Sequence, residues 1–178
     1  LQTGERAISH TKTLIDYKSF DELYNDFENE LKREINILLK RLDIYLDNYA
    51  KYRPSFLLSS MTYDCLEKGR SINAGGARYM DYGGSGVGIP NVGDSLYAIK
   101  KAIFDYKRFS AKEMLDAIRA NFVGYEKIHS YLVNLPKFGS DNAEVDSLVD
   151  RVLLSFTDAL KSHRNKYGGH CRPIILGF

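Results

Sequence analysis

The sequence predicts a mostly α-helical chain with one glycine-rich loop and one terminal strand. Apolar residues recur at intervals of three or four over most of the 178 residues, which is the spacing of one face of a helix. Signals for helix starts and ends divide this pattern into about six helices. A stretch crowded with glycine and a short β-branched tail interrupt the pattern.

The first predicted helix is the longest. Ser19 and Glu22 have the spacing of a capping box, in which two side chains satisfy two free amide donors at the helix start. An apolar stripe follows over some thirty residues: Phe20, Leu23, Phe27, Leu31, Ile35, Leu38, Leu42, Tyr45 and Tyr49. The helix is predicted to end near Tyr52, because Arg53 precedes Pro54 and is displaced from helical geometry.

Two helices are predicted on either side of the glycine-rich stretch. Residues 54–69 form one, with Pro54 in its first turn and Gly69 as a left-handed cap at its end. Apolar residues with helical spacing predict the other over residues 92–106.

Three further helices are predicted in the second half of the chain. A capping box of Ser110 and Glu113 begins one helix, and Gly124 separates it from a short helix that ends before Pro136. A third box, Asp141 with Glu144, begins the sixth helix, which stops before residues 168–169.

The tail, residues 170–178, is apolar, β-branched and too short for a helix, and it predicts a strand. A single strand cannot satisfy its own backbone. Either it pairs with a short segment of this chain or, as we expect, its neighbouring strands lie outside the chain.

The glycine-rich stretch, residues 72–91, raises the question of phosphate binding. The dinucleotide fingerprint needs G-x-G-x-x-G, and both registers fail because Ile89 or Asn91 stands at the third glycine. A P-loop needs Gly-Lys-Ser/Thr, but Ile89 and Pro90 follow Gly88. A helix is predicted before the stretch, where both motifs need a strand. These observations argue against nucleotide binding.

We therefore interpret the stretch as a packing device. Glycine allows positive φ and lets backbone approach backbone, and an arginine and a tyrosine offer donors to buried carbonyls. The predicted structural loop residues are Asn73, Gly75, Gly76, Arg78, Tyr79, Gly83 and Gly84.

Composition excludes several classes of protein. A net charge of +2 without blocks of like charge gives no reason to expect nucleic acid or an anionic membrane as a partner. No apolar run approaches the roughly 20 residues that span a bilayer. The four histidines lack metal-ligand spacing, so no metal site is expected. Cys65 and Cys171 are far apart and are expected to be reduced, buried thiols in a cytoplasmic protein.

Several blocks of sequence resemble the glycyl radical enzymes of the pyruvate formate-lyase-like group, which includes dehydratases, decarboxylases and lyases. These blocks are DCLEKGRSINAGGARY, GVGIPNVGDSLYAIKKAIFDYKR, FSAKEMLDAIRANFVGYE, PKFGSDNAEVDSLV and NKYGGHCRPI. They cover nearly all of residues 53–173 in the order of the family. The resemblance is specific to the family but not to one member.

The resemblance implies that residues 1–178 are a single interior segment of a ten-stranded α/β barrel domain. In that family one loop carries a cysteine that becomes a thiyl radical, and a loop near the carboxyl terminus carries the glycyl radical. A separate activase, which uses S-adenosylmethionine and an iron–sulfur cluster, installs the glycyl radical. The implied partners are the remainder of the enzyme, the activase and, as an option, a second copy in a homodimer.

The family's two radical motifs do not occur in this chain. The radical cysteine stands in a G-C-x-E type motif, and neither DCLE at Cys65 nor HCRP at Cys171 matches it. The R-V-x-G-Y-like glycyl motif is absent, since Gly177 has different neighbours. We therefore assign no catalytic residue to the chain and treat the glycyl radical domain as absent. Ile174 and Phe178 are expected to line the cavity of the complete enzyme.

Two functions remain open at this stage. The first is a fragment, or one part of a split gene, of a glycyl radical enzyme that acts on a small organic substrate. The second is a catalytically inert helical interaction module derived from such an enzyme.

Overall fold

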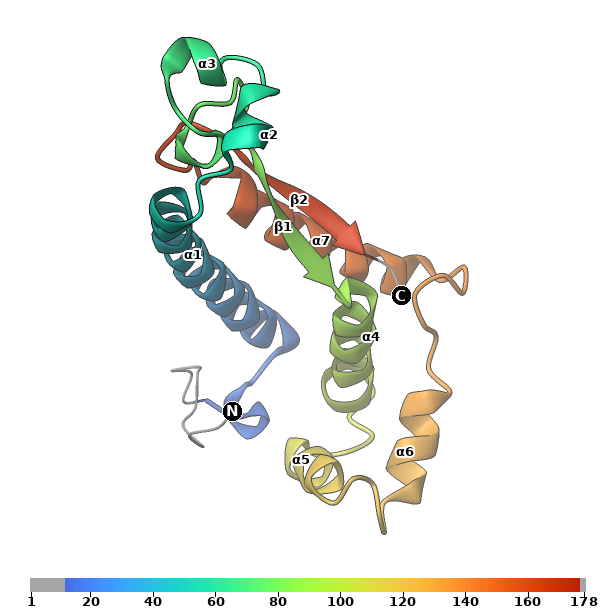
Figure 1. The fold of residues 1–178 in the computed structure, drawn as a ribbon. Coiled ribbons are helices and arrows are strands. Elements are labelled where there is room, and N and C mark those ends of the chain that lie inside the picture. The colour runs from blue at the N-terminus through green and yellow to red at the C-terminus, as the bar shows by residue number, and fades with distance from the viewer. Residues whose placement is uncertain (1–11, 177–178) are drawn as a thin grey trace. The chain divides into compact units, whose positions relative to one another are not determined.

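A computed structural model describes residues 12–176, and this part of the chain is mostly helical, as predicted. It contains seven α-helices and one two-stranded sheet (Figure 1). The helices are α1 (Phe20–Tyr52), α2 (Phe56–Ser60), α3 (Cys65–Lys68), α4 (Ile89–Ile99), α5 (Ala111–Arg119), α6 (Glu126–Val133) and α7 (Ala143–Lys161). The strands are β1 (Tyr82–Val87) and β2 (Cys171–Leu176). None of the helices in this part is long and apolar enough to cross a bilayer.

The chain divides into two compact units. Unit 1 consists of residues 1–30 and 89–152, and unit 2 of residues 31–88 and 153–178. The core of unit 1 lies between the π-helical turn η3 (Lys100–Asp105), α5 and α6, around Ala102, Met114, Ala117 and Ile128. The core of unit 2 is formed by Ile35, Leu39, Leu160 and Cys171, which pack α1, α7 and β2 together. Each unit therefore has its own buried apolar cluster.

Helix α1 begins and ends where the sequence predicts. The amide of Glu22 donates to Ser19 Oγ at 3.2 Å, but the Glu22 carboxylate accepts from the Lys18 amide at 3.1 Å rather than from Ser19. The predicted stripe is wrong in the second half of the helix, where the side chain of Leu38 is 58% exposed. In unit 2 the buried residue that follows Ile35 on this helix is Leu39, four positions later, and not Leu38.

The predicted helix over residues 54–69 is two short helices, α2 and α3. Asp64, between them, has a φ of 73°, and this left-handed residue breaks the helical path. Gly69 ends α3 with a φ of 58°, and its amide donates to Leu66 O, which confirms the predicted left-handed cap.

The helix starts in unit 1 include one correction. Ser110 and Glu113 form the predicted capping box at the start of α5, with the Ser110 amide 2.8 Å from Glu113 Oε2. The box predicted at Asp141 is wrong, because Asn142 Oδ1 accepts from the Glu144 amide at 3.2 Å. Asp141 has a φ of 57°, and the Glu144 carboxylate bonds the ammonium groups of two lysines in η3 instead.

The terminal strand finds its partner inside this chain, contrary to our expectation. β2 pairs in parallel with β1, with Tyr82 beside Cys171 and Val87 beside Leu176. Gly83 and Gly84, predicted in a loop, therefore lie in a strand. Glycine has a low strand propensity, so the sequence YGGSGV carries no strand signal. A Cβ on Gly84 would lie 2.8 Å from Leu160 Cδ1, so a larger residue where β1 meets α7 would have to displace the buried Leu160 side chain.

Candidate functional site

The first half of the glycine-rich stretch packs against neighbouring loops of unit 2. Asn73 Nδ2 donates to Arg53 O at 3.1 Å. Gly75 has a φ of 82°, and a Cβ there would lie 2.6 Å from the Tyr167 ring. A Cβ on Gly76 would overlap the carbonyl oxygen of Arg70. These contacts favour a role in close packing for this half of the stretch.

Arg78 and Tyr79 do not serve buried carbonyls, which corrects that part of the prediction. The Arg78 guanidinium forms two bonds to Asp64 Oδ1, at 2.7 Å from Nη2 and 3.0 Å from Nε. This guanidinium holds the pKa of the Asp64 carboxyl below its ordinary value. It also lies 5.2 Å from the centroid of the Tyr63 ring. The Tyr79 side chain is exposed.

Asn165 is a central residue that the sequence did not single out. It is 4% exposed, and its Nδ2 donates to Met80 O at 2.7 Å. Its Oδ1 accepts from the amides of Tyr167 at 2.9 Å and Gly169 at 3.0 Å. Asn165 thus closes its own turn and attaches it to the segment before β1. An asparagine near two glycines indicates a turn, but no sequence signal joins it to a residue 85 positions away.

The two-stranded sheet has one face that packs on the core of unit 2 at Cys171, with Ile175 on that face 44% exposed, and one open face. Successive side chains alternate between the faces, so Cys171 lies on one and Arg172, Ile174 and Leu176 lie on the other. Cys171 is buried in the unit 2 core, whereas Ile174 is 45% exposed. On β1 the open face carries Gly83, Ser85 and Val87. Glycine and serine are small, so the first two of these positions cover little of the face. We call this surface the open sheet face. Phe178 lies outside the described residues.

A carboxylate organises the start of β2. Asp81 Oδ1 accepts from the His170 amide at 2.8 Å, and Asp81 Oδ2 accepts from Arg172 Nε at 2.5 Å. These two bonds hold the pKa of Asp81 below its ordinary value. The Arg172 side chain is therefore anchored to Asp81 at the edge of the open sheet face while it stays 70% exposed.

The covered face carries buried polar groups. Burial, with smaller contributions from Cys171 and Asp43, raises the pKa of Tyr82 to about 12, so its phenol stays protonated. His163 Nε2 lies 3.4 Å from Asp43 Oδ2, and the Tyr82 ring meets the His163 ring edge-on. These groups join α1, the segment after α7 and β1 within unit 2.

Both cysteines are free and buried. Cys65 is buried in α3 and Cys171 in β2, and burial raises the pKa of the Cys171 thiol. Cys65 is 3% exposed and lies on the wall of a cavity of about 230 Å³ beside α2 and α3, whereas Cys171 is enclosed in the core of unit 2. Among residues 12–176 no three His, Cys, Asp or Glu side chains form a group that could hold a metal ion.

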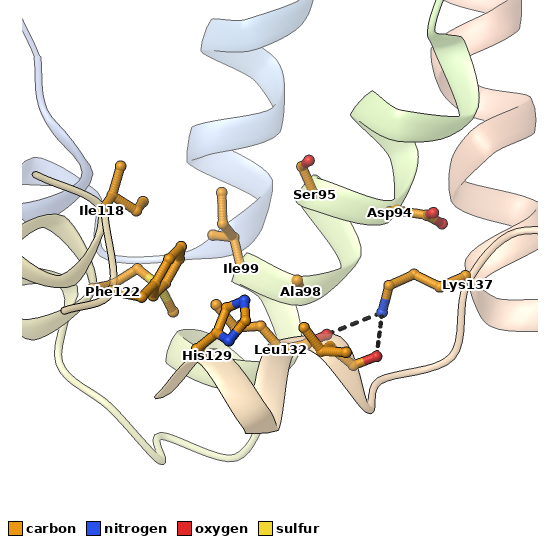
Figure 2. Close-up of a pocket in the computed structure, with 11 residues that line it drawn as sticks. Asp94, Ser95, Ala98, Ile99, Ile118, Phe122, His129, Leu132 and Lys137 are labelled. Atoms are coloured by element: carbon orange, nitrogen blue, oxygen red, sulfur yellow. Dashed lines mark hydrogen bonds between the residues drawn. The ribbon is translucent and has the colours of Figure 1, made fainter. Parts of the chain in front are cut away.

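Unit 1 contains an apolar pocket of about 340 Å³ between α4, α5 and α6. Figure 2 shows Phe122 and His129 on one side of it and Ile99 and Leu132 nearby. Phe122 has a φ of 62°, and its ring centroid lies 5.0 Å from that of His129. The charged residues at the rim already have partners: Lys137 Nζ donates to Leu132 O at 3.0 Å, and Asp94 accepts from the Phe138 amide. Besides these two, the polar side chains of the lining are Ser95 and His129, and the rest of the lining is apolar.

Comparisons with known proteins place this geometry in a family. The family model described as Pyruvate formate lyase-like matches residues 1–178. The trans-4-hydroxy-L-proline dehydratase of Clostridioides difficile is 34% identical over 161 residues, which are 90% of this chain and 20% of that protein. The chain thus spans about a fifth of the length of this curated relative.

Solved structures agree with this match. The glycerol dehydratase of Clostridium butyricum, solved with glycerol bound, superimposes with a TM-score of 0.89 and 32% identity. The superposition covers 95% of this chain and 22% of that one. A glycyl radical enzyme of Archaeoglobus fulgidus gives a TM-score of 0.86 and 32% identity, over 96% of this chain and 21% of that one. On this evidence the chain belongs to the pyruvate formate lyase-like family of glycyl radical enzymes.

Proposed function

We propose that this chain is one segment of a longer glycyl radical enzyme that performs radical lyase chemistry on a small organic molecule. The match across residues 1–178, combined with coverage of only a fifth of the relatives, supports this proposal. In this proposal the chain forms part of the wall of the family's ten-stranded barrel. The remainder of the enzyme and a radical activase that uses S-adenosylmethionine and an iron–sulfur cluster are its partners.

The open sheet face carries the proposal. Parallel sheets are normally covered on both faces, because both sides of such strands are apolar. Here the core of unit 2 covers one face at Cys171, although Ile175 on that face is 44% exposed, while Ile174 and Leu176 on the other face are 45% and 38% exposed. A barrel wall has this arrangement, with helices outside and a substrate cavity inside. Ile174 lines that cavity in our proposal, and Phe178 has the same position in the alternation of the strand.

The chain's own residues do not fit a radical site. Both cysteines are buried and lack the family's motif, and Gly75, Gly76 and Gly169 are explained by close contacts with neighbouring groups. We therefore assign no step of the reaction to these cysteines and glycines. The chain's part in the chemistry is to shape the cavity and to exclude water and stray hydrogen donors from a radical formed elsewhere in the enzyme.

A chimeric enzyme tests the proposal. The segment of the Clostridium butyricum glycerol dehydratase that matches this chain is replaced by residues 1–178. The same segment of the C. difficile hydroxyproline dehydratase serves as the control exchange. We expect both chimeras to fold and, after anaerobic activation, to show an organic radical by electron paramagnetic resonance.

Two outcomes would count against the proposal. One is a control chimera that forms the radical while the chimera with this chain does not. The other is coding DNA around this segment that holds stop codons in place of a G-C-x-E cysteine motif and a glycyl motif. That second outcome would support an inert interaction module instead.

A further inference from the structure

Unit 1 carries a second groove, between the loop that follows η3 and one face of α6. The groove has a volume of about 560 Å³, and its lining shares no residue with the apolar pocket described above. Arg108 and Phe109 line it from the loop, and Lys127, Ser130 and Tyr131 line it from α6. Its whole lining belongs to unit 1. Cavities of this size are typical of sites for small organic ligands.

The loop that carries Arg108 is fixed to the core of unit 1. The amides of Arg108 and Phe109 both donate to Ala102 O, at 2.8 Å and 3.2 Å, and Ala102 is buried. Lys107 has a φ of 47°, a conformation that lysine rarely adopts. Such backbone outliers persist where surrounding contacts hold them, and they are common at ligand clamps. The backbone that supports the Arg108 side chain is therefore in place before a ligand arrives.

Two aromatic rings connect this loop to α6. Phe109 and Tyr131 meet edge-on, with their ring centroids 5.5 Å apart. The Arg108 guanidinium lies 4.8 Å from the centroid of the Tyr131 ring. Both aromatic side chains are half-buried, and both line the groove. The groove therefore combines an apolar wall with a guanidinium that the same wall holds in position.

Two cations at the groove lack an anionic partner. Among residues 12–176 no hydrogen bond or ion pair joins the side chain of Arg108 or of Lys127 to another group. The acid of the lining, Glu126, is already engaged, because its Oε1 accepts from the Gly124 amide at 2.9 Å. Bonds from its own amide and from the Gly124 amide hold the pKa of the Glu126 carboxyl below its ordinary value. The positive charge of the groove is therefore available to a ligand.

We propose that this groove binds a small organic anion with a flat apolar body, of the class of the aromatic carboxylates. The planar fork of the Arg108 guanidinium matches the two oxygens of a carboxylate, and Lys127 adds a second positive charge. The ring of the ligand lies against Phe109 and Tyr131. The groove belongs to unit 1 and the open sheet face to unit 2, so the inference does not rest on the proposed function.

Titration of the 178-residue chain with para-fluorobenzoate, followed by fluorine nuclear magnetic resonance at constant ionic strength, tests the proposal. We expect saturable binding in the millimolar range or tighter. The neutral probe is para-fluorobenzyl alcohol, which has the same ring without the charge. It is expected to bind at least about tenfold more weakly, because it forms no charge-assisted bond with Arg108.

Substitutions locate the binding. Arg108→Gln removes the charged fork and is expected to weaken the binding of para-fluorobenzoate about tenfold or more. Lys127→Gln is expected to weaken it about threefold, because an ammonium on a flexible stem makes a less directional contact. Lys112→Gln is the matched control, since Lys112 is exposed on α5 and lies outside the lining. It removes the same charge and should change the affinity by about twofold or less.

Four results would overturn the proposal. The first is a chain that does not bind para-fluorobenzoate at millimolar concentrations. The second is an Arg108→Gln variant with an unchanged circular dichroism spectrum that binds it as tightly as the unchanged chain. The third is equal affinity for the neutral alcohol, which would make the groove an apolar site. The last is a glycerol dehydratase chimera that shows no binding dependent on Arg108, because an acidic side chain of the longer enzyme would then occupy the groove.

Discussion

At the scale of single residues, glycine at position 75 is required for two separable reasons. Its φ of 82° disfavours any side chain, and the Tyr167 ring fills the space that a Cβ would need. Gly124 has almost the same φ, 80°, with no atom within 4 Å of an added Cβ. The pair therefore separates the backbone effect from the packing effect.

We predict that Gly75→Ala destabilises the chain more than Gly124→Ala does. Both variants lose about 1 kcal/mol because of the left-handed backbone. Gly75→Ala also displaces the Tyr167 ring and loses about 1–3 kcal/mol more through overpacking. Chemical denaturation followed by circular dichroism gives both free energies of unfolding. Equal losses in the two variants would show that Tyr167 moves aside without cost.

Asn165 supports the strongest prediction at this scale. Asn165→Ala leaves Met80 O and the amides of Tyr167 and Gly169 without their partner inside unit 2. Unsatisfied buried groups cost about 1–3 kcal/mol each, so we expect a total loss of at least about 2 kcal/mol. Asn134→Ala is the control, because exposed Asn134 bonds only within the end of its own helix. It should change the free energy of unfolding by about 0.5 kcal/mol or less. Similar losses in both variants would contradict a central role for Asn165.

At the scale of elements, local signals predicted several helix starts and ends. The Ser110 box, the Gly69 cap and the end of α1 before Pro54 all follow from residues within one turn of the feature. Strand β1 could not be predicted this way. Its glycines have no intrinsic strand preference, and they are extended because β2, some 90 positions later, lies beside them. The Asn165 turn was missed for the same reason, since its contact with Met80 spans the chain.

The start of α7 gives a prediction about an element. Asn142 is the residue that caps this helix, with Oδ1 3.2 Å from the amides of Glu144 and Val145. Asn142→Ala should therefore cost about 1 kcal/mol, the usual loss for a helix cap. Asp141→Gly should be neutral or slightly stabilising, because glycine adopts the φ of 57° found there without strain. Thermal unfolding of both variants compares them, and a larger loss for Asp141→Gly would restore Asp141 as the cap.

At the scale of the whole molecule, two surfaces are open for different reasons. The open sheet face carries Ile174 and Leu176 on a parallel pair whose other face packs on the core of unit 2 at Cys171. The short helices α2 and α3 carry exposed apolar side chains, Phe56 and Leu66 among them, while Ser59 on the inward side of α2 already accepts from the Ile72 amide. Neither surface could be inferred from composition, because the sequence does not show which side of an element the core will take.

The last prediction places Ile174 in the complete enzyme and rests on the proposed function. In the glycerol dehydratase chimera, Ile174→Ala enlarges the cavity, so we expect a higher KM or a lower kcat while the radical signal stays unchanged. Ile175→Ala is the matched control, because residue 175 points to the opposite face of β2 and has a similar exposure, 44% against 45%. That control removes the same side-chain volume from the other face of β2 and should leave the kinetic constants unchanged. If the two variants have the same kinetic constants, the open sheet face does not line the cavity. If both also lose the radical, the failure lies in the assembly of the enzyme rather than in the placement of Ile174.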